Sequence, residues 1–191
     1  MSKKIVFFDF DNTITKRDTL PTFLKYLYPL PIFLFKSLIF LPFYVLFKLR
    51  LISNNLAKKI LVFIFFKELK IEYFEEKVRK FTLEILPKLI KPKSLELINK
   101  YKKENYQIVI VTANFEQILY LWAKNNQLEL IGTQLEIKGN KFTGKLASKN
   151  CRDYEKVNRI KQKFNLNKLI KSFIPLSKSL ISIVVSKLNL K

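Results

Sequence analysis

An apolar segment that ends in two carboxylates places the strongest constraint on how this chain can fold. Residues 5–8 are Ile-Val-Phe-Phe, and such β-branched and aromatic side chains predict a buried β-strand. Asp9 and Asp11 follow, and on an extended chain both side chains point the same way. Asn12 and Thr13 favour a turn. Two like charges at about 4 Å and an effective dielectric near 20 repel by about 4 kcal/mol, so we expect a cation or a shared proton here, unless this is an ordinary polar strand end.

Two later segments also place polar side chains beside a strand or helix end. Residues 106–111 (YQIVIV) predict a second strand, which ends in Thr112-Ala113-Asn114 before a helix expected over residues 115–125. A hydroxyl followed by free helix amides is a ready anion site. Lys156, in the segment Tyr154-Glu155-Lys156-Val157, opens a helix expected to run to about Phe164. Taken alone, this lysine is as typical of a solvated helix face as of a binding site.

The order and spacing of these three segments resemble the motifs of the haloacid dehalogenase superfamily of phosphohydrolases. FDFDNT resembles the first motif, DxDx(T/V), VTAN the strand-ending Ser/Thr motif, and YEKV the lysine motif. The resemblance implies a Mg²⁺-dependent phosphatase that hydrolyses a phosphate monoester through an aspartyl-phosphate. It implies that Asp9 is the nucleophile and a Mg²⁺ ligand, that Asp11 is the general acid/base and binds Mg²⁺ through its backbone carbonyl, and that Thr112, Ala113 and Lys156 bind the phosphoryl group.

The predicted fold class is α/β, with a Rossmann-like core around a parallel sheet and an inserted all-helical cap. We expect the core over residues 1–14 and 88–170, the strongly apolar cap over residues 15–87, and an atypical tail over residues 171–191. Within the core, residues 130–136 and 141–146 predict a hairpin around Gly139-Asn140. A helical cap directly after the first motif is similar to that of the phosphoserine-phosphatase-like branch.

The segment over residues 20–51 is overwhelmingly apolar and aromatic, and it leaves three interpretations open. It forms a buried cap core, it spans a membrane, or it lies in the interface of an anionic membrane. Lys36 stands near its middle, at a cost of about 2.5–3.5 kcal/mol for insertion, and three prolines (Pro29, Pro31 and Pro42) also disfavour a simple span. An aromatic cap flanked by lysines favours a lipid phosphate and is similar to phosphatidylglycerophosphate phosphatases of this branch. A phosphoserine-phosphatase-like enzyme acting on a phosphorylated small molecule is the alternative.

The resemblance ends after about residue 165. The family's fourth motif is an acidic, glycine-containing loop, whereas Glu155 is the last carboxylate here and Gly144 the last glycine. We therefore expect an incomplete core, a weakened metal site and impaired turnover, as in a truncated or frameshifted remnant of the family. Such a remnant would still associate with a membrane if residues 20–51 do so. Alternatively, residues 181–185 form a substitute edge strand without a catalytic role.

Composition excludes several other functions. There is no histidine, which rules out a histidine triad or a histidine-ligated metal, and Cys151 is the only cysteine, which suits a reducing compartment. The first 20 residues do not read as a secretory signal, because Asp9 and Asp11 interrupt any apolar core. We expect a cytoplasmic protein, or one at the inner face of the cell membrane. The net charge of +21 is spread along the chain, as base-composition drift would produce, so we expect no specific nucleic-acid partner.

Overall fold

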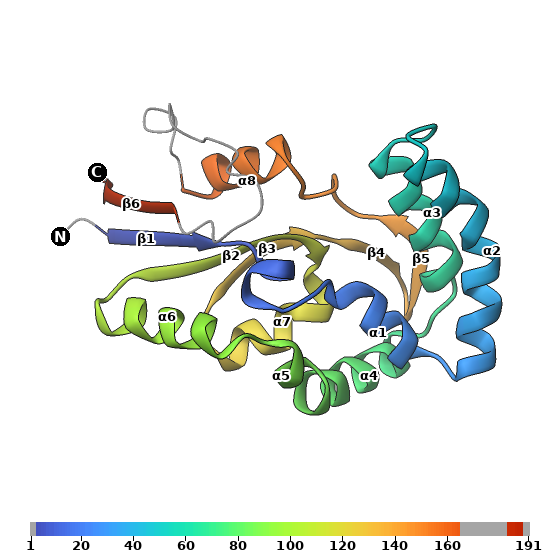
Figure 1. The fold of residues 1–191 in the computed structure, drawn as a ribbon, viewed down its shortest axis with the longest axis horizontal. Helices are drawn as coiled ribbons and strands as arrows, with labels where there is room; N and C mark the ends of the chain where they lie inside the picture. The colour runs from blue at the N-terminus through green and yellow to red at the C-terminus, as the bar shows by residue number, and fades with distance from the viewer. Residues whose placement is uncertain (1–2, 165–182, 189–191) are drawn as a thin grey trace.

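A four-stranded sheet forms the centre of the protein in the computed structural model, which describes residues 3–164 and 183–188 (Figure 1). The strand order is β3-β2-β1-β6. The three parallel strands are β1 (Lys3–Phe8), β2 (Gln107–Phe115) and β3 (Glu129–Thr133), and β6 (Ile183–Leu188) pairs antiparallel with β1 at the edge. The predicted α/β fold class is therefore confirmed. Strand β6 overlaps residues 181–185, for which a substitute edge strand was one of the two interpretations from sequence.

Both faces of β1 are covered, which explains its continuous apolar sequence. Val6 and Phe8 lie in the main core with residues of α6 (Pro92–Lys103) and α7 (Glu116–Asn125). Ile5 and Phe7 face a second cluster built on α8 (Tyr154–Phe164), where the rings of Phe7 and Phe164 meet edge to face at 5.5 Å. The strand is thus fixed between two helical layers, and its carboxyl end has a defined position.

The helices between β1 and α6 leave and rejoin the core at one point. They are α1 (Thr19–Leu27), α2 (Leu30–Lys48), α3 (Asn54–Phe66), α4 (Ile71–Glu84) and α5 (Leu86–Leu89). The amide of Lys16 donates to Leu89 O at 2.8 Å, and the amide of Lys91 donates to Ile14 O at 2.9 Å. We call this paired entry and exit the stem, and the helices α1–α5 beyond it the cap.

The cap packs around an aromatic core that also includes Phe142 of the hairpin, and α2 only borders this core with one edge. Phe23 packs edge to face on Phe74 and Phe81, and Phe74 lies 4.8 Å from the ring of Phe142. Burial therefore accounts for the phenylalanines of α1, α3 and α4, but α2 has no buried residue. A buried cap core is thus the wrong interpretation for residues 30–48.

The hairpin that contributes Phe142 comprises β4 (Leu135–Lys138) and β5 (Lys141–Leu146). Its turn is at Gly139-Asn140, as predicted, and Gly139 has the positive φ of +61° that such a turn requires. The single strand predicted over residues 130–136 is wrong. Gln134 separates β3 from β4, because its backbone amide and carbonyl bond to Ser148 and Ala147 instead of continuing the ladder.

Candidate active site

Asp9 lies immediately after β1 and pairs with Lys156 in the first turn of α8. Lys156 Nζ is 2.7 Å from Asp9 Oδ2, while Asp9 Oδ1 accepts a hydrogen bond from the amide of Phe10 at 2.8 Å. The side chains remain partly exposed, at 34% for Asp9 and 22% for Lys156. The pair is therefore accessible to a ligand from solvent, and Lys156 is the cation that the strand-end carboxylates required.

Asp11 is held by neutral donors rather than by a cation. Its Oδ1 accepts two hydrogen bonds from Thr19, from the amide at 2.8 Å and from the hydroxyl at 2.6 Å, and its Oδ2 accepts one from Asn114 Nδ2 at 3.0 Å. Burial raises the pKa of Asp11 above the usual range, and the hydrogen bonds from Thr19 and Asn114 only partly oppose this. A carboxyl group that holds its proton more firmly than usual is suited to act as a general acid.

The chain turns sharply between these carboxylates and α1. Asn12 has φ of +63°, a left-handed conformation that asparagine tolerates better than most residues. Lys91, a residue of the stem, donates from Nζ to the carbonyl of Asn12 at 2.6 Å. The turn therefore connects the site directly to the base of the cap.

Thr112 and Ala113 lie near the end of β2, which continues to Phe115, one residue beyond the predicted strand end at Thr112-Ala113-Asn114. The strand continues because Phe115 pairs with Thr133 beyond an irregularity in the ladder. Thr112 Oγ1 accepts from the amide of Asn114 at 3.0 Å, and Asn114 Oδ1 in turn accepts from the amide of Phe115 at 2.7 Å. The structure thus links Thr112 to Asp11 through Asn114.

Lys58 of the cap also contacts the Thr112–Asn114 segment. Its Nζ donates to Ala113 O, to Thr133 Oγ1 at 3.0 Å and to Asn150 Oδ1 at 2.8 Å. One helical turn earlier, Asn54 Oδ1 accepts from Asn150 Nδ2 at 3.0 Å. Burial lowers the pKa of Lys58 to about 7. Helix α3 is therefore anchored both to the Thr112–Asn114 segment and to the loop that leads to α8.

Neither Thr19 nor Lys58 was predicted as a site residue. Thr19 opens a helix without a distinctive motif, and Lys58 is one of many lysines and the first of a Lys-Lys pair. Asn114 was noted only as part of the second motif. Their importance comes from contacts between segments far apart in the chain, which no local pattern indicates.

The site offers few side-chain ligands for Mg²⁺. Within residues 3–164 and 183–188, no group of three Asp, Glu, Cys or His side chains could hold a metal ion. Asp9 offers one accessible carboxylate, while the Asp11 carboxylate already accepts three hydrogen bonds. This donor set fits a Mg²⁺ ion that is held jointly with a substrate phosphate, and not one held by protein groups alone. Most of the tail, for which a missing fourth motif was predicted, lies outside the described residues.

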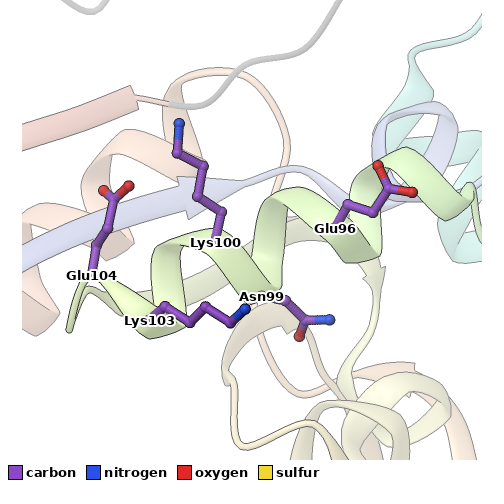
Figure 2. A pocket seen from close by; sticks show the side chains of 5 residues that line it. All are labelled: Glu96, Asn99, Lys100, Lys103 and Glu104. Atoms are coloured by element: carbon purple, nitrogen blue, oxygen red, sulfur yellow. The ribbon is translucent and has the colours of Figure 1, made fainter.

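A separate hollow beside α6 contains none of these groups. Figure 2 shows that its lining comes from polar side chains along one helix, namely Glu96, Asn99, Lys100, Lys103 and Glu104. None of the predicted site residues lies there. The candidate site is therefore the strand-end cluster around Asp9 and Asp11.

A mainly parallel sheet, a helical cap inserted after its first strand and an aspartate–lysine pair at the end of that strand define a capped, Rossmann-like α/β domain with a candidate catalytic site. Residues 6–171 match the family model of haloacid dehalogenase-like hydrolases, and the chain belongs to this family. It is 30% identical over 162 residues to Protein CicA of Caulobacter vibrioides (strain NA1000 / CB15N), an alignment that covers 84% of this chain and 72% of that protein.

Solved structures show the same fold at low sequence identity. A protein of unknown function from Bordetella pertussis Tohama I superposes with a TM-score of 0.74 at 13% identity, over 86% of this chain and 75% of that one. A phospho-aspartyl intermediate analogue of phosphoserine phosphatase has a TM-score of 0.58 at 18% identity, over 87% and 75%. A phosphoserine phosphohydrolase-like protein from Francisella tularensis subsp. tularensis SCHU S4 has the same score and identity, over 85% and 74%. These likenesses establish a fold like that of the phosphoserine phosphatases.

Proposed function

We propose that this protein hydrolyses a phosphate monoester through an aspartyl-phosphate formed on Asp9. The observation that carries the proposal is the accessible ion pair between Asp9 and Lys156. Asp11 follows Asp9 by two residues, and burial raises the pKa of its carboxyl group. Lys156 places positive charge where a transferring phosphoryl group would develop negative charge. Asp9 and Asp11 then have environments different enough to serve as nucleophile and as acid/base, respectively.

In the first step, a carboxylate oxygen of Asp9 attacks phosphorus and the bond to the ester oxygen breaks. Asp11, protonated at that stage, gives its proton to the leaving alcohol. In the second step, Asp11 removes a proton from water, whose oxygen attacks phosphorus, releasing inorganic phosphate and regenerating the Asp9 carboxylate. Lys156, the Thr112 hydroxyl and the Ala113 amide are the groups proposed to stabilise the phosphoryl oxygens.

Mg²⁺ would be held by Asp9 and the main-chain carbonyl of Asp11 together with the substrate phosphate, where it would neutralise phosphoryl charge. Residues 156–191 contain no carboxylate that could complete its coordination. Loss of a ligand or of its supporting groups commonly costs about 10–100-fold in affinity or activity. This observation favours a second candidate, a catalytically impaired member of the family that forms or releases the phosphoenzyme slowly.

The proposed substrate carries its phosphate on an apolar or lipid group. From Thr19 to Lys67, which includes α1, α2 and α3, the cap contains no carboxylate that could bind a substrate amine. A small amino-acid phosphate such as phosphoserine would need such a partner, since a buried charge is costly when it is unpaired. Phosphate release from phosphatidylglycerophosphate or lysophosphatidate should exceed release from phosphoserine. The reverse order would remove the lipid assignment and favour a small-molecule phosphatase.

Trapping of the covalent intermediate tests the chemistry directly. The wild-type chain, Asp9→Asn and Asp18→Asn are mixed with p-nitrophenyl phosphate and Mg²⁺, quenched in acid and analysed by intact mass. Asp18 is the matched control, because it is an exposed carboxylate that contacts Asn12 in the same turn. We expect phosphorylation of the wild type and of Asp18→Asn, but not of Asp9→Asn. Slow dephosphorylation supports the impaired candidate, while equal phosphate release by Asp9→Asn contradicts both.

A further inference from the structure

Helix α2 presents an apolar surface that packing against the other described residues does not explain. It is 19 residues long with a mean hydropathy of 2.1, long and apolar enough to cross a membrane, and none of that stretch is buried. Phe35 and Leu38 leave 65% and 66% of their surface exposed, and Leu34, Ile39, Leu41 and Val45 are also exposed. A contiguous apolar patch on this scale is unusual for a surface that faces only water.

The few contacts that α2 makes with the rest of the cap come from one stripe of the helix. Phe33 and Phe40 pack against the hydrophobic core, and Phe33 meets Phe65 of α3 at 6.4 Å between ring centroids. Lys36 lies on the same stripe, three residues after Phe33 and four before Phe40. The helix is thus attached to α3 along one edge, and Figure 1 shows α2 at the end of the molecule that lies away from β1 and β6.

The charge in the middle of α2 is turned inward. Lys36 Nζ donates to the carbonyl of Ile64 and lies 5.1 Å from the centroid of the Tyr28 ring. Lys36 is the only charged residue between Lys25 and Lys48. Because its ammonium group points to α3, the outer surface of α2 is uncharged along nearly its whole length, while basic residues flank it at both ends.

These charges identify the partner. No carboxylate occurs between Asp18 and Glu68. Apart from Lys36 and Lys58, which bond inside the protein, the same stretch carries five basic residues: Lys25, Lys48, Arg50, Lys59 and Lys67. An apolar face bordered by lysine and arginine, without acidic residues, is complementary to an anionic bilayer, whose head groups attract the cations while the acyl boundary accepts the apolar side chains.

We propose that the outer face of α2 is a docking surface for an anionic lipid bilayer, on which the helix lies parallel to the membrane plane. The inward contacts of Phe33, Lys36 and Phe40 favour lying on the membrane over spanning it, because a spanning helix would have to leave α3. The proposal does not require catalytic turnover, and vesicle binding tests it separately from phosphoenzyme formation.

Flotation with vesicles of phosphatidylcholine, with and without phosphatidylglycerol, measures the binding. The wild-type chain should float with the anionic vesicles, less so in high salt, and only weakly with the neutral ones. Phe35→Ser with Leu38→Ser should lower the partition coefficient about tenfold or more, because two large apolar side chains no longer enter the bilayer. Leu83→Ser is the matched control, since Leu83 on α4 is 65% exposed but lies outside this face, and it should bind like wild type.

Circular dichroism verifies that the variants fold, so that a loss of vesicle binding can be assigned to the changed surface of α2 and not to unfolding. A dye on Leu38→Cys should be quenched more by lipids with a shallow nitroxide than by those with a deep one. Deeper quenching would overturn the parallel orientation. Absent binding, equal binding to neutral vesicles, or an equal loss in Leu83→Ser would overturn the proposal. If the α2 substitutions abolished self-association of the chain but left vesicle binding unchanged, this face would bind a second copy of the protein and the proposal would be overturned.

Discussion

Replacing Thr19 by valine should raise the pKa of Asp11 further above its usual range. The substitution removes the hydroxyl that donates to Asp11 Oδ1 at 2.6 Å, and it keeps the Thr19 amide, which donates to the same oxygen at 2.8 Å. A hydrogen bond to a charged group contributes about 1.5–3 kcal/mol, and one pKa unit corresponds to about 1.4 kcal/mol. Because these bonds favour the ionised carboxylate, their loss adds to the effect of burial, which already raises the pKa of Asp11.

Carbon-13 detected titration of the Asp11 side-chain carboxyl measures this shift without any need for turnover, and Asp11→Asn assigns the resonance. Where activity is measurable, the alkaline limb of the phosphoenzyme-formation rate should move to higher pH in Thr19→Val, since that step needs protonated Asp11. Thr82→Val is the matched control. Thr82 is also a buried cap threonine, but its hydroxyl has no hydrogen-bond partner among the described residues, and it should leave the Asp11 titration unchanged. An unchanged titration in a folded Thr19→Val protein would refute the assigned electrostatic role.

Three further outcomes follow from the contacts of single side chains. Lys156→Gln removes the cation that pairs with Asp9 at 2.7 Å and should slow phosphoenzyme formation by about 100-fold or more, measured by rapid acid quench; an unchanged rate would exclude Lys156 from the site. Burial lowers the pKa of Lys58 from 10.5 to about 7, so between these pH values the unfolded chain binds the proton that the folded chain has lost, and stability should rise with pH. Urea unfolding at pH 6, 8 and 10 should show this rise weakened in Lys58→Met but retained in Lys59→Met, which alters an exposed neighbour; equal slopes would contradict the burial of Lys58. Thr82→Val should increase the free energy of unfolding by about 1 kcal/mol, because a buried hydroxyl without a partner is replaced by a methyl group, and a loss of stability would mean that the hydroxyl is satisfied.

The elements that could be predicted from sequence are those fixed by local patterns. The run from Ile5 to Phe8 is apolar on both faces because helices cover both, and the turn after Asp11 follows from residues that favour turns. The Gly139-Asn140 hairpin is likewise a local feature, since its glycine takes the required positive φ.

What could not be predicted depends on pairing between distant segments. The extension of β2 to Phe115 and the break at Gln134 depend on which strand lies alongside, and Thr133 provides the partner in the first case. Lys58 is distinguished from other lysines only by its acceptors, Ala113, Thr133 and Asn150. The apolar pattern of α2 is the same for a buried, spanning or interfacial helix, and the structure adds the inward direction of Lys36.

The stem has a consequence for the order of folding. Strand β1 pairs with β2 in the register Ile5 to Gln107, so the central pair of the sheet joins residues about 100 positions apart, a separation that slows folding. The hydrogen bonds between Ile14 and Lys91 and between Lys16 and Leu89 bring the two ends of the cap together. Once they form, the cap acts as one closed loop, and the remaining chain between β1 and β2 is short. We therefore expect the helices of the cap to assemble before the sheet, with the stem as the step that couples the two and reduces the entropic cost of joining the strands.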